Sequence, residues 1–330
     1  MAKTNRIEQL DAAVQVMMAN RRTGVQGDAL VRLAADLRDL PTVNFRARLK
    51  SELMKEAEMT STIAPEKPHA VDPVPKGYRT LTPYIVSQDA EALIGFVQDV
   101  LGGELMFRTV GSAGGIHSEV RVEDSMLMIG GGAKNLAWKG ESRPGAFHVY
   151  VPDCDAAYER GLQAGAEGIS PPTDHPYGER GANLEDRDGN HWYLATRFGK
   201  RFKEEGTPTV IPCLFPLRVE PVLDFLKSAF GAEELFRHAL PNGAIRYMSV
   251  KVGSSLLEMG EAHGKYQPMK SMFYLYVRDC DAVYRQALEA GATSIYPPTD
   301  HDYGDRGCGV RDVFGYEWYI ATHIRDIDGR

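Results

Sequence analysis

His148 and Glu258 are the two side chains whose type and local setting best suit proton transfer. Histidine titrates near neutral pH, so a histidine in a ligand cavity could serve as a general base. Glu258 lies between Leu257 and Met259, where burial would raise the pKa of its carboxyl group and let it exchange a proton. Two simpler interpretations stay open: a core histidine bonded to Tyr193 or to a backbone carbonyl, and an acid that faces solvent.

An internal duplication helps to separate structural from chemical residues. Residues 147–196 match residues 273–322 without a gap, at roughly half of the positions. A residue type kept in both copies is expected to serve the fold, whereas one found in a single copy is a candidate for chemistry. His148 corresponds to Tyr274, so the duplication does not require a histidine at that position.

The elements that must position these residues form a unit that recurs four times. In each unit a strand is followed by a helix, which a glycine often ends, and then by three short strands. The predicted helices of the first three units span residues 89–101, 153–164 and 221–230, and the fourth follows from the duplication. The sequence therefore predicts an α+β fold of four β-α-β-β-β units, paired in chain order into two domains at residues 79–198 and 208–324.

The N-terminal part of the chain has a different pattern. Apolar residues recur at helical spacing between residues 5 and 58, which predicts a small helical segment over residues 1–59. Four prolines then mark residues 60–78 as a linker. The apolar stripes of the helices would pack on the body of the protein or on another subunit. Docking of a different protein, as in a ligand-sensing regulator, is the alternative.

Composition limits the classes of partner and compartment. The net charge of −7 argues against nucleic acid, and no apolar run approaches the roughly 18 residues of a membrane span. The start of the chain lacks the apolar core of a signal peptide. The cysteines contain no C-x-x-C pair, so we expect reduced thiols in a cytoplasmic protein. They are Cys154, Cys213, Cys280 and Cys308.

Several motifs carry a resemblance to a known family. They are Thr80–Val86, Asp153–Ala157, Tyr177–Arg180 and Asp186–Trp192, the last two recurring at residues 303–306 and 312–318. With its paired units, the chain resembles the vicinal oxygen chelate superfamily over about residues 79–324, most closely its phosphonate-operon-associated, glyoxalase-like branch. That superfamily includes glyoxalase I, bleomycin-resistance proteins and extradiol dioxygenases. The resemblance implies an incomplete eight-stranded, cup-like sheet in each domain and leaves the chemistry open.

The resemblance also implies where a divalent metal would be held, at one position on the first and one on the last strand of each unit. These positions fall at Thr82, Met128, Ala146, Tyr193, Ile211, Glu258, Met272 and Tyr319. A metal needs three or four converging donors, so a set with a single ligand predicts two domains without metal. A shift of two residues would make His148 a ligand, with Glu258 as the matching acid in the other domain, and a divalent metal stays possible.

Strand alternation predicts the side chains that line each cup. The first cup would contain Thr82, Tyr84, Met128, Ala146, His148 and Tyr193, and the second Ile211, Cys213, Glu258, Met272, Tyr274 and Tyr319. Such mixed linings suit an aromatic or amphipathic ligand that a few polar groups orient. Trp138, in the loop after the first unit, would stack over the ligand at the mouth of the cup or cover a sheet edge.

Two further features have weaker implications. The loop 171–181 is nearly identical in its second copy, which favours a structural role in which Arg180 pairs with Asp186. A place for this loop on the rim of the cup is the alternative. His117 and Glu119 form an H-x-E pair on one face of a strand, a weak indication of a metal site.

Two functions are compatible with these observations. The first is a metal-free protein of the glyoxalase/bleomycin-resistance type, which binds a small aromatic or hydrophobic molecule in a cup and sequesters it. The alternative is a lyase, isomerase or dioxygenase that uses His148 or Glu258 for proton transfer, or a divalent metal held by other residues. Either function has a small molecule as its partner, and a homodimer is a possible assembly.

Overall fold

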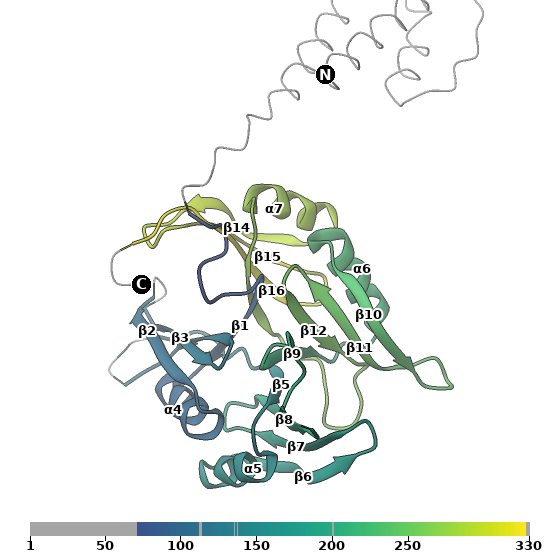
Figure 1. Cartoon of the computed structure of the whole chain (residues 1–330). Coiled ribbons are helices and arrows are strands. Elements are labelled where there is room, and N and C mark those ends of the chain that lie inside the picture. Colours follow the sequence, from purple (N-terminus) through teal and green to yellow (C-terminus); the bar gives the residue numbers. More distant parts are fainter. Residues whose placement is uncertain (1–70, 112–113, 135, 137, 200, 328–330) are drawn as a thin grey trace, which may run out of the picture. The chain divides into compact units, whose positions relative to one another are not determined.

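The computed structural model describes residues 71–327 except for residues 112–113, 135, 137 and 200 (Figure 1). The predicted helical segment 1–59 and the first part of the proline-rich linker lie outside the described residues. The predicted α+β fold is confirmed, with four β-α-β-β-β units that form two eight-stranded sheets.

Each unit contains one helix and four strands. The first unit consists of β1 (Leu81–Ser87), α4 (Ala90–Leu101), β2 (Glu104–Val110), β3 (Ile116–Val122) and β4 (Ser125–Gly131). The second consists of β5 (Ala146–Tyr150), α5 (Cys154–Gln163), β6 (Glu167–His175), β7 (Glu179–Glu185) and β8 (His191–Arg197). The third consists of β9 (Val210–Leu214), α6 (Val219–Phe230), β10 (Glu233–Ala239), β11 (Ile245–Val252) and β12 (Ser255–Met259). The fourth consists of β13 (Met272–Tyr276), α7 (Cys280–Glu289), β14 (Thr293–Asp300), β15 (Asp305–Arg311) and β16 (Glu317–His323).

The helix ends follow the local signals in the sequence. Asp89, Asp153 and Asp279 cap the N-termini of α4, α5 and α7, because each carboxylate accepts a hydrogen bond from the backbone N–H three residues later. Gly102 and Gly231 end α4 and α6 in the left-handed conformation, with φ of 71° and 65°. These residues determine where each helix begins or ends, and therefore where the neighbouring strands can begin.

The pairing of units into sheets differs from the prediction. In one sheet, here called sheet A, the strand order is β14-β15-β16-β13-β1-β4-β3-β2, so the first unit pairs with the fourth. In sheet B the order is β10-β11-β12-β9-β5-β8-β7-β6, so the second unit pairs with the third. The expectation that consecutive units share a cup is therefore wrong. Strands pair through backbone hydrogen bonds, whereas the sequence pattern shows only how side chains alternate. The pattern therefore does not determine which two units place their first strands side by side.

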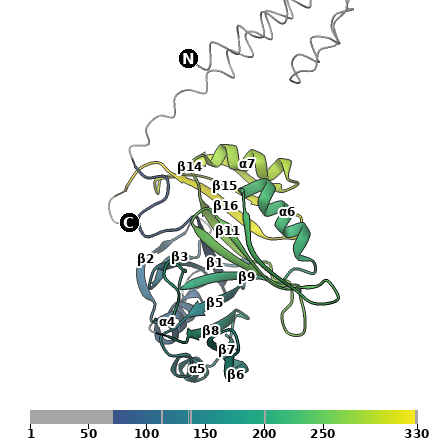
Figure 2. The ribbon, with the colours of Figure 1, turned by 45° about the vertical axis from the view of Figure 1, so that its right-hand side comes forward.

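The hydrophobic cores, in contrast, follow the two halves of the sequence. One core consists of buried residues of the first two units together with Val210 of β9, and the other of buried residues of the last two units together with Leu81 of β1. Trp192 and Trp318 lie fully buried in these cores, and α4 packs on α5 as α6 packs on α7. Figure 1 and Figure 2 show α6 and α7 side by side on the outside of their strands. Each half therefore has its own core while both sheets run across the halves.

Two serines tie the halves together at equivalent places. The backbone N–H of Val210, at the start of β9, donates to the hydroxyl of Ser125 at 3.0 Å. The backbone N–H of Leu81, at the start of β1, donates to the hydroxyl of Ser255 at 2.8 Å. Each contact joins the first strand of one half to the first residue of β4 or β12 in the other half, so the two sheets are held in fixed relation.

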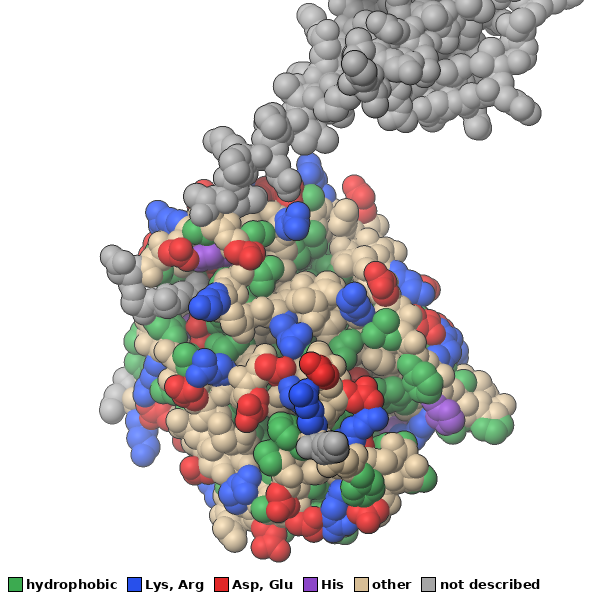
Figure 3. All heavy atoms as spheres, in the orientation of Figure 1, with side chains coloured by type: hydrophobic (Ala, Val, Ile, Leu, Met, Phe, Trp, Pro, Cys, Tyr) green, Lys and Arg blue, Asp and Glu red, His purple; other side chains and the backbone are tan. Residues whose placement is uncertain are grey.

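The surface carries charges of both signs. Lys and Arg side chains are interspersed with Asp and Glu side chains on the face shown in Figure 3. Several form exposed ion pairs, among them those of Arg108 with Glu91 and of Arg121 with Glu104. Within the described part of the chain, no helix has the length and apolar character needed to cross a membrane.

Candidate functional site

The paired first and last strands of each unit bring four side chains to the centre of each sheet. In sheet B, β5 and β8 place His148 beside Tyr193, and β9 and β12 place Cys213 beside Glu258. In sheet A, the equivalent positions hold Tyr84, Met128, Tyr274 and Tyr319. The two sheets thus present different chemistry from the same architecture.

The predicted central positions were two residues off along the first strands. Ala146 and Ile211 in sheet B, and Thr82 and Met272 in sheet A, lie two residues before the positions that pair with the last strands. A shift of two residues along a strand keeps the side chain on the same face of the sheet. The predicted face is therefore correct, while the position along the strand changes. The register is set by the strand ladder, which the sequence pattern alone did not locate.

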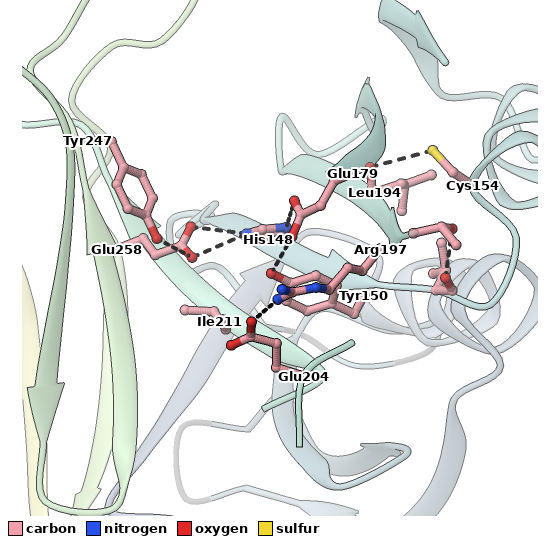
Figure 4. A network of polar contacts seen from close by, with 12 residues as sticks. His148, Tyr150, Cys154, Glu179, Leu194, Arg197, Glu204, Ile211, Tyr247 and Glu258 are labelled. Atoms are coloured by element: carbon pink, nitrogen blue, oxygen red, sulfur yellow. Dashed lines mark hydrogen bonds and ion pairs between the residues drawn. The ribbon is translucent and has the colours of Figure 1, made fainter. Parts of the chain in front are cut away.

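His148 and Glu258 meet on sheet B (Figure 4). Nδ1 of His148 lies 3.2 Å from each carboxylate oxygen of Glu258. The prediction that these residues lie in different cups is wrong, because the second and third units pair. The partner of His148 is thus a carboxylate. The alternative, a core histidine bonded to Tyr193 or to a backbone carbonyl, names a different partner.

A second carboxylate faces the other side of the imidazole ring. Nε2 of His148 lies 4.0 Å from Oε2 of Glu179, which begins β7. The other oxygen of Glu179 accepts a hydrogen bond of 3.0 Å from the hydroxyl of Tyr150. Glu258 in turn accepts a hydrogen bond of 3.1 Å from the hydroxyl of Tyr247. Figure 4 shows the imidazole between the two carboxylates, each held by a tyrosine.

The pair changes the acidity of both partners. Burial alone would lower the pKa of His148, but the charges of Glu258 and Glu179 and the hydrogen bond to Glu258 outweigh it and raise that pKa. Burial alone would raise the pKa of Glu258, but the charge of His148 and hydrogen bonds from His148, Tyr247 and Cys213 lower it. The predicted rise in the pKa of Glu258 is therefore wrong, because the structure gives this acid a cationic partner.

The neighbouring thiol and phenols stay protonated. Burial, followed by the nearby charge of Glu258, raises the pKa of the Cys213 thiol well above its usual value. Burial likewise raises the pKa values of the Tyr193, Tyr150 and Tyr247 hydroxyl groups. The site therefore combines one histidine and two acidic side chains with neutral hydrogen-bonding groups.

Aromatic rings pack beside these polar groups. The ring of Tyr193 lies 6.0 Å from that of Phe215 and 5.4 Å from that of Tyr266, which stacks on Phe215 at 5.3 Å. Asn183 donates a hydrogen bond of 3.2 Å to the hydroxyl of Tyr266 and so ties the loop after β12 to β7. This cluster supplies planar apolar surface next to the His148–Glu258 pair.

Sheet A holds a different polar network. Tyr274 and Tyr276 both donate to Oδ2 of Asp305 at 3.0 Å, and Nδ1 of His323 lies 2.8 Å from its other oxygen. Asp305 is fully buried, with 0% of its surface exposed. Elsewhere on this sheet, Nδ1 of His117 lies 2.9 Å from the hydroxyl of Tyr84. The groups of sheet A thus largely satisfy one another.

Sequence comparison agrees with this architecture. Residues 79–194 and 214–320 match the family described as the Glyoxalase/Bleomycin resistance protein/Dioxygenase superfamily. The chain belongs to this superfamily. The glyoxalase-like resemblance expected from the motifs is confirmed at this level, together with the tandem arrangement of two matching regions.

Solved structures and curated sequences also resemble this chain. Glyoxalase I from Zea mays superimposes with a TM-score of 0.58 at 14% identity, over 74% of this chain and 92% of that chain. An uncharacterized protein from Mycobacterium tuberculosis is 28% identical over 150 residues, which are 40% of this chain and 88% of that protein. A Mycobacterium bovis protein, also uncharacterized, is 28% identical over 132 residues, 37% of this chain and 87% of that protein. The likeness to the maize enzyme shows a shared fold.

The donors present do not fit the divalent metal that the superfamily implies. In residues 71–327, outside the short gaps, no group of three or more His, Cys, Asp or Glu side chains is arranged to hold a metal ion. Sheet A offers three tyrosines and a methionine at its centre, and its H-x-E pair, His117 and Glu119, has its two side chains 3.6 Å apart. In sheet B the imidazole and the carboxylate of the pair bind each other, beside a protonated thiol and phenol.

Two other predictions concern Trp138 and Arg180. Trp138 packs near Gly115 and Gly140, in the loop that follows the first unit, and its contact with a ligand stays a prediction. Arg180 pairs with Asp155 and Asp174, and the predicted pairing with Asp186 is wrong. Asp186 instead accepts a hydrogen bond of 2.8 Å from the indole N–H of Trp192, a contact repeated by Asp312 and Trp318.

Sequence reasoning missed Glu179 and Tyr150 as site residues. Both were within the duplicated region, where Glu179 corresponds to Asp305 and Tyr150 to Tyr276. The structure shows that both pairs make the same tyrosine-to-carboxylate hydrogen bond, at 3.0 Å in each sheet. The available signal was an acidic residue that precedes an arginine in both copies, Glu179 in one and Asp305 in the other. Because Glu179 lies in the loop 171–181, it was given the structural role proposed for that loop.

Proposed function

We propose that the protein is a metal-free small-molecule-binding member of its superfamily, with its ligand site on sheet B around the His148–Glu258 pair. The ligand is a small aromatic or hydrophobic molecule with polar substituents. Its apolar part packs against the aromatic cluster of Tyr193, Phe215 and Tyr266, and its polar part reaches the charged pair. Sequestration of this molecule is the biological role that such a site supports.

The observation that carries the proposal is the composition of the four central positions of sheet B. A histidine and a carboxylate bind each other there, and the other two groups are a protonated thiol and a protonated phenol. Such a set is poor at gathering a divalent ion, but it offers donors and acceptors beside apolar rings. The side chains of His148 and Glu258 are 16% and 11% exposed, so a ligand on this face can contact both.

Two measurements on the full chain test this proposal. Elemental analysis after incubation with Fe, Ni, Zn and Mn and desalting should find no stoichiometric metal. Calorimetric titration with a panel of small aromatic compounds should find a ligand whose affinity falls at least tenfold in Tyr193→Ala, which removes the central ring. The matched control is Tyr319→Ala, the repeat equivalent in sheet A, which should leave that affinity unchanged. Retained metal, or equal loss in both variants, would contradict the proposal.

Metal-free proton transfer is the second candidate function. The observation that favours it is the histidine between two carboxylates, since such a ring is oriented and can pass a proton to or from a substrate. A lyase or isomerase reaction uses such a step. Turnover by the metal-free protein, at a rate whose dependence on pH disappears in His148→Phe, would support catalysis. Stoichiometric binding without turnover would support sequestration.

Four finer predictions extend the proposal. They are membership of the phosphonate-operon-associated branch, a cytoplasmic location, a small molecule as the partner, and a homodimer. Size-exclusion chromatography with light scattering tests the last, because a dimer of the 36.5 kDa chain should have twice that mass.

A further inference from the structure

We propose that the ligand of sheet B is an uncharged molecule with a hydroxyl group, and that this hydroxyl bridges Nε2 of His148 and the carboxylate of Glu179. The inference rests on the proposed function, because it names the chemical class that the same site accepts. It follows from a gap between two polar groups and from the way in which the other sheet fills the equivalent position.

The gap lies between Nε2 of His148 and Oε2 of Glu179, which are 4.0 Å apart. This distance exceeds the 2.7–3.2 Å or so of an N–H···O hydrogen bond, so the two groups attract each other without a direct bond. An oxygen atom about 2.8 Å from both would satisfy both, since a hydroxyl can accept from one group and donate to the other. The two side chains are 16% and 14% exposed, so such an oxygen can come from outside the protein.

The imidazole ring is oriented for this contact. Its Nδ1 side is held by both oxygens of Glu258, at 3.2 Å, which turns Nε2 towards Glu179. Each ring nitrogen faces a carboxylate, an arrangement that favours a hydrogen on both nitrogens and that raises the pKa of His148, so Nε2 is placed to donate a hydrogen bond. Oε1 of Glu179 accepts from Tyr150 at 3.0 Å, which leaves Oε2 as the oxygen that faces the histidine (Figure 4).

Sheet A shows which chemical group occupies the equivalent position. Glu179 corresponds to Asp305 and His148 to Tyr274, in the two copies of the duplication. In sheet A, Tyr274 reaches the carboxylate itself and donates to it at 3.0 Å, beside the hydroxyl of Tyr276. Sheet B keeps the second phenol, as Tyr150, but has a shorter imidazole in place of the first. A hydroxyl from the ligand would take the place of the Tyr274 hydroxyl.

The groups that border the gap select against an anionic ligand. Glu179 places a carboxylate on one side of the gap, so a second negative group there would be repelled. A carboxylate ligand also lacks the hydrogen that Glu179 needs, and an ether can accept from His148 but cannot donate to Glu179. The favoured ligand is therefore a phenol or alcohol whose apolar body lies against the adjacent aromatic cluster.

Three probes of one shape test this selection on the full chain. Isothermal titration calorimetry at pH 7 would compare 2-naphthol, 2-methoxynaphthalene and 2-naphthoate. We expect 2-naphthol to bind at least tenfold more tightly than either of the others, because one hydrogen bond to a charged group provides about this discrimination. Equal affinity of 2-naphthol and its methyl ether would overturn the inference while leaving the proposed function in place. Failure of all three to bind would count against both.

Two variants locate the effect. His148→Tyr installs the residue of sheet A, whose hydroxyl should fill the gap at Glu179 and remove the preference for 2-naphthol. Tyr274→Phe, the matched control, removes a hydroxyl from sheet A and should leave the preference unchanged. Circular dichroism would confirm that both variants are folded. A Glu179→Gln variant provides an independent check, because it keeps the shape of the side chain and should reduce the preference at least fivefold. A preference for 2-naphthol that persists in both His148→Tyr and Glu179→Gln would contradict the bridge.

Discussion

Sheet A and sheet B share one architecture, yet their central residues solve different problems. In sheet A the buried Asp305 receives two phenols and a histidine, so its charge is compensated within the protein. In sheet B the equivalent Glu179 receives one phenol, and His148 stops 4.0 Å away. The comparison suggests that sheet A serves stability and sheet B serves binding. The predictions below test that division.

The largest effect is expected when the carboxylate of sheet A is removed. Asp305→Ala leaves two buried phenols and a histidine without their acceptor, and should lower the free energy of unfolding by about 3 kcal/mol or more. The equivalent change in sheet B, Glu179→Ala, removes one hydrogen bond at a partly exposed position and should cost about 1 kcal/mol. Urea denaturation of the two variants measures the difference. Similar losses of unfolding free energy would show that Asp305 and Glu179 contribute equally to stability.

A double-mutant cycle tests the pair in sheet B. Glu258→Leu alone leaves His148 and Tyr247 without an acceptor, and should cost about 2 kcal/mol. His148→Phe with Glu258→Leu removes both charges and should cost less than the sum of the two single changes. Thermal or urea unfolding of the four proteins gives the coupling energy. A coupling near zero would mean that the two side chains do not act as a pair.

The pair also predicts a dependence of stability on pH. The pKa of His148 is raised above 6.5, so its stabilising contribution is full below about pH 6.5 and is lost as pH rises through the raised value. The pKa of Glu258 is lowered below 4.5, so its contribution is full above about pH 4.5 and is lost as pH falls. The difference in melting temperature between wild type and His148→Phe should therefore be largest between these limits. A difference in melting temperature that grows above pH 7 would contradict a raised pKa for His148.

The smallest difference is expected on the other face of the sheets, where the copies agree. Asp186→Asn and Asp312→Asn each weaken a hydrogen bond from a buried tryptophan, of 2.8 and 2.9 Å. Each should cost about 1 kcal/mol, and the two costs should agree within about 0.5 kcal/mol. Chemical denaturation would measure both. Unequal costs would show that the two copies have diverged in their cores as well as in their cups.

The sequence predicted what local patterns and duplication can encode. The four units, the glycine that ends α4, and the face on which His148 and Glu258 lie all follow from spacing and residue type. The meeting of His148 with Glu258 does not, because it depends on β5 pairing with β9 rather than with β1. That choice is made by long-range backbone contacts and by ties such as Ser125 with Val210. The pKa of Glu258 was misjudged for the same reason.

Sheets that cross two separate cores have a consequence for how the chain can fold. The first half can gather its core as soon as its helices are made, but β1 reaches its partner β13 only after most of the chain exists. Until then β1 and β5 present open edges, which favour pairing with other chains. We therefore expect the isolated first half to self-associate through these edges, and folding of the whole chain to be slow relative to proteins of similar size with local contacts.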